Sequence, residues 1–124
     1  MPEHTCEVVV VHCIDFRLQP YLNGWLVDHF GERNYDRVAV AGAVKNLDFV
    51  MGQLEISHRL HQVKVVVLIN HEDCGAYGAQ GTKEHHHHDL VDAEEKIKAR
   101  FPTLRVEAFY LHLSGMFERI RVDQ

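Results

Sequence analysis

Two strongly apolar runs in this sequence each end in side chains that can bind a metal ion. The first run, residues 8–11, leads into Cys13, and the second, residues 65–69, leads into His71 and Cys74. Continuous runs of this kind are typical of strands that are buried on both faces of a parallel sheet. Because open α/β sheets bind ligands at the carboxyl ends of their strands, we expect two thiols and one imidazole to converge there. The sequence therefore predicts a metal site in outline.

The donor set suits zinc, which prefers thiolate and imidazole ligands in a tetrahedral arrangement. A catalytic zinc site uses three protein ligands and leaves the fourth position to water or substrate. The two-residue spacer between His71 and Cys74 lets both side chains turn toward one point. The expected cofactor is therefore Zn²⁺, bound by Cys13, His71 and Cys74. The alternative is that Cys13 and Cys74 are buried thiols that act as small hydrophobic groups.

Two charged residues follow the first cysteine at alternate positions. Asp15 and Arg17 lie two and four residues after Cys13. An extended backbone points all three side chains to one side, so Arg17 can hold Asp15 as a carboxylate through a pair of hydrogen bonds. We expect Asp15 either to accept a hydrogen bond from zinc-bound hydroxide or to occupy the fourth ligand position. A purely structural ion pair that fixes the loop is the alternative for Asp15 and Arg17.

The segments that must position these residues alternate between strand and helix patterns. Hydrophobic periodicity predicts strands at 7–12, 35–42, 63–70 and 105–113, and helices at 18–30, 47–60 and 89–100. Such alternation is typical of βαβ units, so we predict the α/β class, with a mainly parallel sheet of about four strands flanked by helices. Ser114 and Gly115 favour a turn into a C-terminal hairpin edge strand, residues 116–122. The whole chain, 1–124, is expected to form a single domain.

A glycine-rich and histidine-rich region separates the third strand from the last helix. One short helical turn is expected to start at Asp73 or Cys74, and residues 75–81 contain too many glycines for a long helix. The polar segment 82–88 is predicted to be a loop. Its tract His85-His86-His87-His88 is interpreted as solvated and as binding metal adventitiously, and a functional role such as proton shuttling is the alternative.

Composition excludes several classes of partner. The formal net charge is −5 and the 13 Lys and Arg residues form no basic stripe, so nucleic acid is not an expected partner. The apolar runs are too short to span a membrane and the N-terminus carries no export signal, so we expect a soluble, cytoplasmic protein with no membrane partner. Three cysteines in such a chain argue against a disulfide framework and leave Cys6 as a spare thiol.

Other reactive residues receive simpler interpretations. A phosphatase loop built on Cys13 would need an arginine six positions later, where this chain has Gln19, so a nucleophilic role for Cys13 is disfavoured. His12 is expected to point away from the site, because neighbouring residues of a strand face opposite sides. Glu72 and Asp73 are interpreted as loop or helix-capping residues rather than ligands. Surface or satisfied core positions are expected for His58, His61 and His112, and core positions for Tyr21, Trp25 and Phe109.

The two candidate metal-binding segments together resemble a known family. The motif Cys13-x-Asp15-x-Arg17, followed far downstream by His71-x-x-Cys74-Gly75, is similar to the zinc signature of the β-class carbonic anhydrases. Ala41-Gly42 with Asn46 resembles the alanine-glycine-asparagine loop that lies between those motifs in the family. The order of elements matches as well, so the resemblance extends from about residue 8 to about residue 122.

The resemblance implies a function and a role for each of these residues. It implies a carbonate dehydratase, a zinc lyase that reversibly hydrates carbon dioxide to bicarbonate through zinc-bound hydroxide, with Cys13, His71 and Cys74 on the metal. Asp15 and Arg17 would match the family's dyad, which orients the hydroxide or closes the site by direct ligation of the aspartate. The physical basis is the lowered pKa of metal-bound water. By analogy with the family, a homodimer or a higher homo-oligomer is expected, with active sites at the subunit interface.

The sequence also departs from the family pattern. Only twelve residues precede Cys13, whereas typical members carry a longer N-terminal helical arm that wraps over the partner subunit. The loop at residues 43–45 is less rich in glycine than usual. Phe16, Val44 and Tyr77 are expected to line a carbon dioxide pocket. Two alternatives stay open: a zinc-binding protein of the same fold without hydration activity, and a hydrolase of carbonyl sulfide or carbon disulfide.

Overall fold

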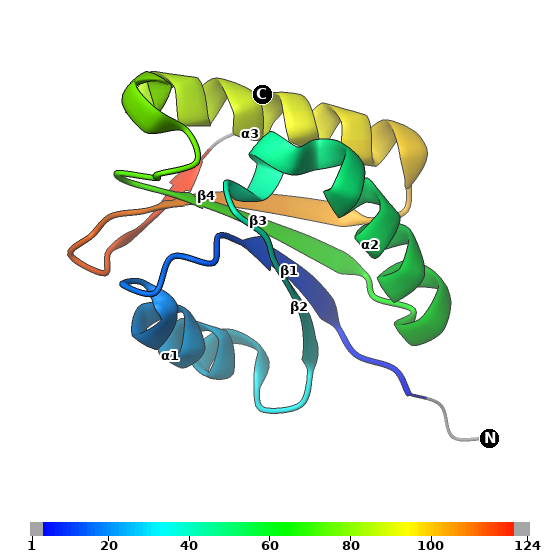
Figure 1. Cartoon of the computed structure of the whole chain (residues 1–124). Coiled ribbons are helices and arrows are strands. Elements are labelled where there is room, and N and C mark those ends of the chain that lie inside the picture. The colour runs from blue at the N-terminus through cyan, green and yellow to red at the C-terminus, as the bar shows by residue number, and fades with distance from the viewer. Residues whose placement is uncertain (1–3, 121–124) are drawn as a thin grey trace.

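A five-stranded sheet forms the centre of the protein in the computed structural model, which describes residues 4–120 (Figure 1). Its strands are β1 (Val8–His12), β2 (Tyr35–Ala39), β3 (Val65–His71), β4 (Arg105–Leu111) and β5 (Phe117–Ile120). They lie in the order β2-β1-β3-β4-β5, in which β2, β1, β3 and β4 are parallel and β5 is antiparallel to β4. The predicted α/β class, mainly parallel sheet and hairpin edge strand are confirmed.

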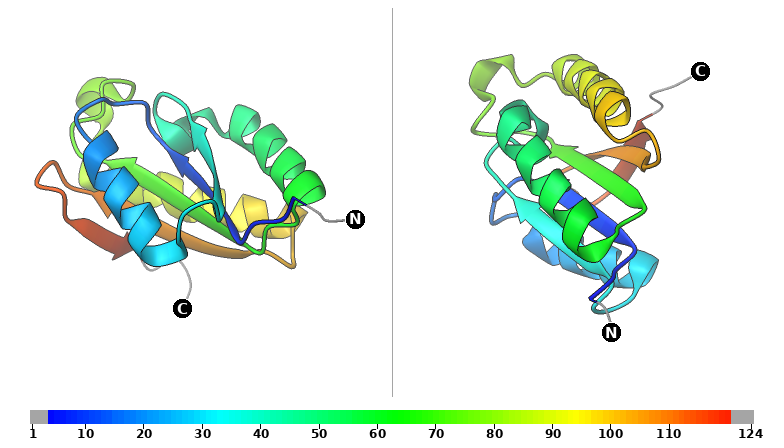
Figure 2. Two further views of the ribbon diagram at one scale, coloured as in Figure 1. Left: turned by 90° about the horizontal axis from the view of Figure 1, so that it is seen from below. Right: turned by 90° about the vertical axis from the view of Figure 1, so that its right-hand side faces the viewer.

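Helices cover both faces of this sheet. The longer helices are α1 (Gln19–Phe30), α2 (Leu47–His61) and α3 (Lys83–Arg100), and two short 3-10 helices are η1 (Ala43–Asn46) and η2 (Gly78–Gln80). Helix α1 lies on one face, whereas α2 and α3 lie on the other (Figure 1). Seen from below, α1 is in front of the sheet and α3 behind it (Figure 2, left). Within residues 4–120, no helix combines the length and apolar character that a membrane crossing requires.

The valines of β1 show why this arrangement forms. All four are completely buried, with Val8 and Val10 in the core beneath α1, and Val9 and Val11 in the core on the opposite face. Burial of one such side chain contributes roughly 1.5–3 kcal/mol. A strand that is apolar at every position gains this contribution on both faces only between two layers of helices, which explains the central place of β1.

The predicted loop at residues 82–88 is wrong, because α3 begins at Lys83. The side chain of Thr82 accepts a hydrogen bond from the backbone N–H of His85 (3.1 Å) and so caps the start of the helix. His86 is completely buried one turn before Leu90 and continues the buried stripe of the helix. The polar histidine tract concealed this helical periodicity in the sequence.

Smaller details concern a turn, two strands and one aromatic residue. The single helical turn expected at Asp73 or Cys74 is present: the backbone N–H groups of Tyr77 and Gly78 donate to the carbonyl oxygen of Cys74, and η2 follows at Gly78–Gln80. The predicted strand 35–42 ends at Ala39, and the last part of the predicted edge strand, residues 121–122, lies outside the described residues. Tyr21 is 42% exposed, so its predicted core position is wrong, because its ring lies over the turn at Gly115 rather than over the sheet.

Two glycines of this fold should respond in opposite ways to the same substitution. Gly115 has φ +96°, and a Cβ there would lie 2.7 Å from the ring of Tyr21, so Gly115→Ala should destabilise the protein by about 1–2 kcal/mol. Gly24 lies inside α1 with open space beside it, so Gly24→Ala should stabilise by roughly 0.5–1 kcal/mol. Urea unfolding measures both changes. An unchanged midpoint for Gly115→Ala would show that the turn does not require glycine.

Candidate metal centre

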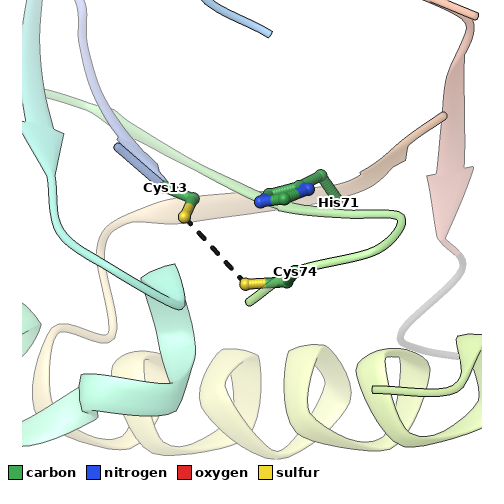
Figure 3. A group of neighbouring side chains, drawn as sticks. All are labelled: Cys13, His71 and Cys74. Atoms are coloured by element: carbon green, nitrogen blue, oxygen red, sulfur yellow. Dashed lines mark hydrogen bonds between the residues drawn. The ribbon is translucent and has the colours of Figure 1, made fainter. Parts of the chain in front are cut away.

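Three potential metal ligands meet at the carboxyl ends of β1 and β3. The two strands are adjacent and parallel, with Val11 opposite Leu68, so Cys13 emerges beside the end of the strand that carries His71. Cys74 follows three residues later in the turn. Their ligand atoms all lie within 4.8 Å of one another, and the sulfur atoms of Cys13 and Cys74 are 4.0 Å apart. The three side chains point toward one another (Figure 3).

The geometry of this group fits a tetrahedral zinc ion. Two sulfurs that are each about 2.3 Å from one zinc are separated by about 3.8 Å at the tetrahedral angle, close to the spacing found here. The Nδ1 atom of His71 lies 2.7 Å from the carbonyl oxygen of Glu72, which places the imidazole proton on Nδ1. Nε2 of His71 is buried and has no hydrogen-bond partner among the described residues. An unpartnered lone pair beside two thiols is what a metal ligand requires.

The surroundings also favour thiolate ligands. Burial by itself raises the pKa of the Cys13 thiol, but the protonated form of the His71 imidazole and the backbone N–H of Gly42 stabilise the thiolate and lower this pKa to about 7. The Gly42 N–H lies 3.4 Å from the sulfur of Cys13. Burial, together with the charge of nearby Cys13, raises the pKa of Cys74. A divalent cation would remove this mutual repulsion and stabilise both thiolates.

Asp15 and Arg17 form a fixed pair beside the ligands. The guanidinium of Arg17 donates to Asp15 from Nε (3.0 Å, to Oδ1) and from Nη2 (2.7 Å, to Oδ2). The same guanidinium reaches Asp73, with one bond to its carboxylate (3.1 Å) and one to its carbonyl (2.9 Å). Oδ2 of Asp15 thereby lies 3.9 Å from Nε2 of His71. Arg17 thus connects the loop after β1 to the turn that carries Cys74.

This pairing keeps Asp15 ionised. Hydrogen bonds from the Arg17 side chain are the largest influence and lower the pKa of Asp15 to about 2, against a smaller effect of burial. The carboxylate is therefore an acceptor of hydrogen bonds at all physiological pH values, and it is too weak a base to take up a proton.

An open pocket of about 640 Å³ reaches Cys13, one of the three candidate ligands. It is lined by Cys13, Ile14, Asp15, Phe16, Arg17, Ala41, Asp73, Gly75 and Ala76. Phe16 is part of this lining. The position expected for Val44 is wrong, because this residue of η1 turns its small apolar side chain into the core. Tyr77 packs behind Cys13 and Cys74 instead of facing the pocket.

A buried polar network behind Cys74 was not predicted from the sequence. The hydroxyl of Tyr77 donates to Asp89 (2.8 Å) and accepts from the side-chain amide of Asn70 (3.0 Å). The same amide lies 2.9 Å from Nδ1 of His86. Burial lowers the pKa of His86 to about 4, so this imidazole is neutral. The signal in the sequence was the spacing of His86 and Leu90, four residues apart on one helix face.

The remaining candidate residues take structural roles. Nε2 of His12 accepts a hydrogen bond from Arg37 (3.1 Å), away from the three ligands. Gln19, at the position that a phosphatase loop would give to arginine, donates to the backbone carbonyl of Asp15 (2.8 Å) and holds the loop after β1. His88 at the end of the histidine tract is exposed.

Comparison with known proteins gives a consistent family relationship. A family model described as "Putative carbonic anhydrase" matches residues 3–121. An uncharacterized protein of Rickettsia conorii is 31% identical over 133 residues, which cover 92% of this chain and 72% of the relative. A second uncharacterized protein, from Rickettsia bellii, is 29% identical and covers 92% of this chain and 81% of its own length.

Solved structures show the same fold at low sequence identity. A carbonic anhydrase from Streptococcus mutans superposes with a TM-score of 0.67 at 18% identity, over 98% of this chain and 86% of the other. A carbonic anhydrase from Glaciozyma antarctica gives 0.63 at 17% identity, over 98% and 85%. Tetrameric β-carbonic anhydrases from Sordaria macrospora give 0.60 at 15% identity, over 96% and 82%.

The ion pair leads to a prediction about pH. In metal-free protein we expect carboxyl NMR to give a pKa near 2 for Asp15, and Arg17→Gln to return this pKa toward its ordinary value. Because the folded-state pKa lies below the unfolded-state pKa of roughly 4, the pair stabilises the fold above that pH. Its contribution is lost as the pH falls from about 4 to about 2. Titration of Asp15 near pH 4 in the wild type would contradict the pairing.

Proposed function

Because this chain belongs to the carbonic anhydrase family and has the β-class fold, we propose that it catalyses the zinc-dependent, reversible hydration of carbon dioxide to bicarbonate. The observation that carries the proposal is the convergence of Cys13, His71 and Cys74, with an ionised Asp15 beside them. Zinc held by these three residues would supply a Lewis acid that lowers the pKa of water and makes a nucleophile available near neutral pH.

In this proposal Asp15 orients the attacking water. Its carboxylate lies 3.9 Å from Nε2 of His71, and hydrogen bonds from the Arg17 side chain hold it there. A carboxylate with a pKa of about 2 accepts a hydrogen bond without removing the proton, so the proton leaves by way of solvent or buffer. Asp15 would have a second role: released from Arg17, its carboxylate would take the fourth ligand position and close the site.

The pocket suits a small apolar substrate. Ile14, Phe16, Ala41 and Ala76 supply apolar surface to its lining, and the charged residues of the lining are Asp15, Arg17 and Asp73, which form one bonded group. Carbon dioxide has no hydrogen to donate and gains little from polar contacts, so this apolar surface suits it.

Stopped-flow measurement of carbon dioxide hydration on the full chain tests the proposal. We expect hydration above the buffer rate, with one zinc bound at Cys13, His71 and Cys74. Cys74→Ser should lose both this zinc and the activity. Asp15→Asn should keep zinc but lose about 10–100-fold in rate, the usual cost of removing a group that orients the ligands or water of a metal site.

A matched control and a contrary result complete this test. Asp28→Asn changes an exposed aspartate of α1 and should leave the rate unchanged. Zinc bound at full occupancy without hydration between about pH 6.5 and 9, a range that spans the expected pKa near 7 of catalytic metal-bound water, would refute the proposed activity.

We also propose that the chain forms homo-oligomers through the rim of this pocket. Phe16 is 83% exposed and Ile14 is 59% exposed, and both lie at the entrance. Large apolar side chains that are exposed together are characteristic of interfaces. The tetrameric β-carbonic anhydrases with the same fold support this expectation.

Light scattering after size exclusion measures the oligomer. We expect a mass of at least two chains, and Phe16→Ser should shift the equilibrium toward the monomer because it removes an apolar contact of the interface. Leu60→Ser, which alters a 53% exposed side chain near the end of α2, is the control and should not change the mass. A wild-type monomer at high concentration would exclude the proposed interface.

A further inference from the structure

A second group of metal-binding side chains lies at the opposite end of the sheet. Cys6 precedes β1, Asp36 belongs to β2, and His61 is the last residue of α2. Their ligand atoms all lie within 4.8 Å of one another. The end of α2 and the chain that enters β1 lie at the right-hand end of the sheet in Figure 1, whereas the carboxyl end of β1 is on the left. This group is therefore separate from Cys13, His71 and Cys74.

Hydrogen bonds hold two of these side chains in place. Nδ1 of His61 and the hydroxyl of Ser57 both lie 2.6 Å from the same carboxylate oxygen of Asp36. The backbone N–H of Cys6 donates to the carbonyl oxygen of His61 (3.1 Å), which fixes the approach of the cysteine. The three residues are thus brought together by contacts between secondary-structure elements rather than by proximity in the sequence.

The same contacts argue against a catalytic triad of cysteine, histidine and aspartate. A nucleophilic cysteine needs a lowered pKa. Here burial, followed by the negative charge of Asp36, raises the pKa of Cys6. A thiol and a carboxylate that face each other repel as anions, and a divalent cation between them would stabilise both.

There is also room for an ion and its remaining ligands. A cavity of about 480 Å³ adjoins the group and is lined in addition by His4, Thr5, Arg33 and Tyr35. The ring centroid of His4 lies 6.5 Å from that of His61. The side chains of Asp36 and His61 are 28% and 33% exposed, so an ion can enter from solvent.

We propose that Cys6, Asp36 and His61 form a second metal site, which takes a transition-metal ion of the Zn²⁺ class. One sulfur, one imidazole nitrogen and one carboxylate oxygen suit Zn²⁺ or Co²⁺, whereas Mg²⁺ and Ca²⁺ require oxygen ligands. Because the three ligands come from the segment before β1, from β2 and from α2, a bound ion cross-links these elements. The site therefore stabilises the fold, independently of the proposed hydration activity.

Titration with Co²⁺ tests the site, because cobalt bound to thiolate absorbs in the near ultraviolet. The full chain is used with His87→Gln and His88→Gln, which remove two exposed histidines of α3 that would also bind Co²⁺. We expect two equivalents of Co²⁺ in this protein, and one equivalent after Cys6→Ser or His61→Gln. His58→Gln, one turn earlier on α2, is the matched control and should retain two equivalents.

A second measurement isolates the new site. Cys13→Ser combined with Cys74→Ser removes the first centre, and the remaining Co²⁺ should still give thiolate absorption, which Cys6→Ser then abolishes. Zn²⁺ should raise the melting temperature of the Cys13→Ser, Cys74→Ser protein by several degrees and should have no effect once Cys6 is also replaced. A single equivalent of Co²⁺ before any cysteine is changed, with the same spectrum after Cys6→Ser, would overturn the proposal.

Discussion

The parallel pairing of β1 with β3 is the constraint on which the proposed metal centre depends. Cys13 and His71 are far apart in the sequence, and they become neighbours because these two strands run in the same direction and end at the same edge. A slip of one residue would turn Cys13 to the other face of the sheet. Because the four identical valines of β1 fit either core, they do not fix this register. Contacts at the start of the strand do so, where the backbone of Glu7 bonds to Asn34 and Lys64.

Polar contacts around the ligands fix the loop after β1 and the turn that carries Cys74, whose positions the strand pairing alone does not determine. Arg17 connects the loop after β1 to Asp73, and so restrains the turn that carries Cys74. Behind that turn, Tyr77 is held through Asp89 of α3 and Asn70 of β3. Buried polar groups are costly unless they are paired, so this network specifies one arrangement of the turn. Contacts from a strand, a loop and a helix therefore hold the ligands in position.

The two ends of the sheet differ in their chemistry. At the carboxyl ends of the strands, two thiols and an imidazole nitrogen that has no hydrogen-bond partner within residues 4–120 are deeply buried, and Cys13 lines a pocket. At the amino ends, a cysteine, an aspartate and a histidine are partly exposed, and the aspartate and histidine side chains are hydrogen-bonded to each other. The first arrangement suits a reactive centre with an open ligand position, and the second suits an ion that ties elements together.

The sequence by itself determined the alternation of strands and helices, and the position of the candidate ligands at strand ends. Both follow from local patterns: continuous apolar runs predict buried strands, and Cys13, His71 and Cys74 directly follow or end such runs. Only the tertiary structure decided that α3 starts at Lys83, because burial of His86 depends on Asn70 and Tyr77, which lie on other elements. It also decided that Cys6, Asp36 and His61 meet, since side chains from three elements come together only after packing, and no spacing in the sequence records it.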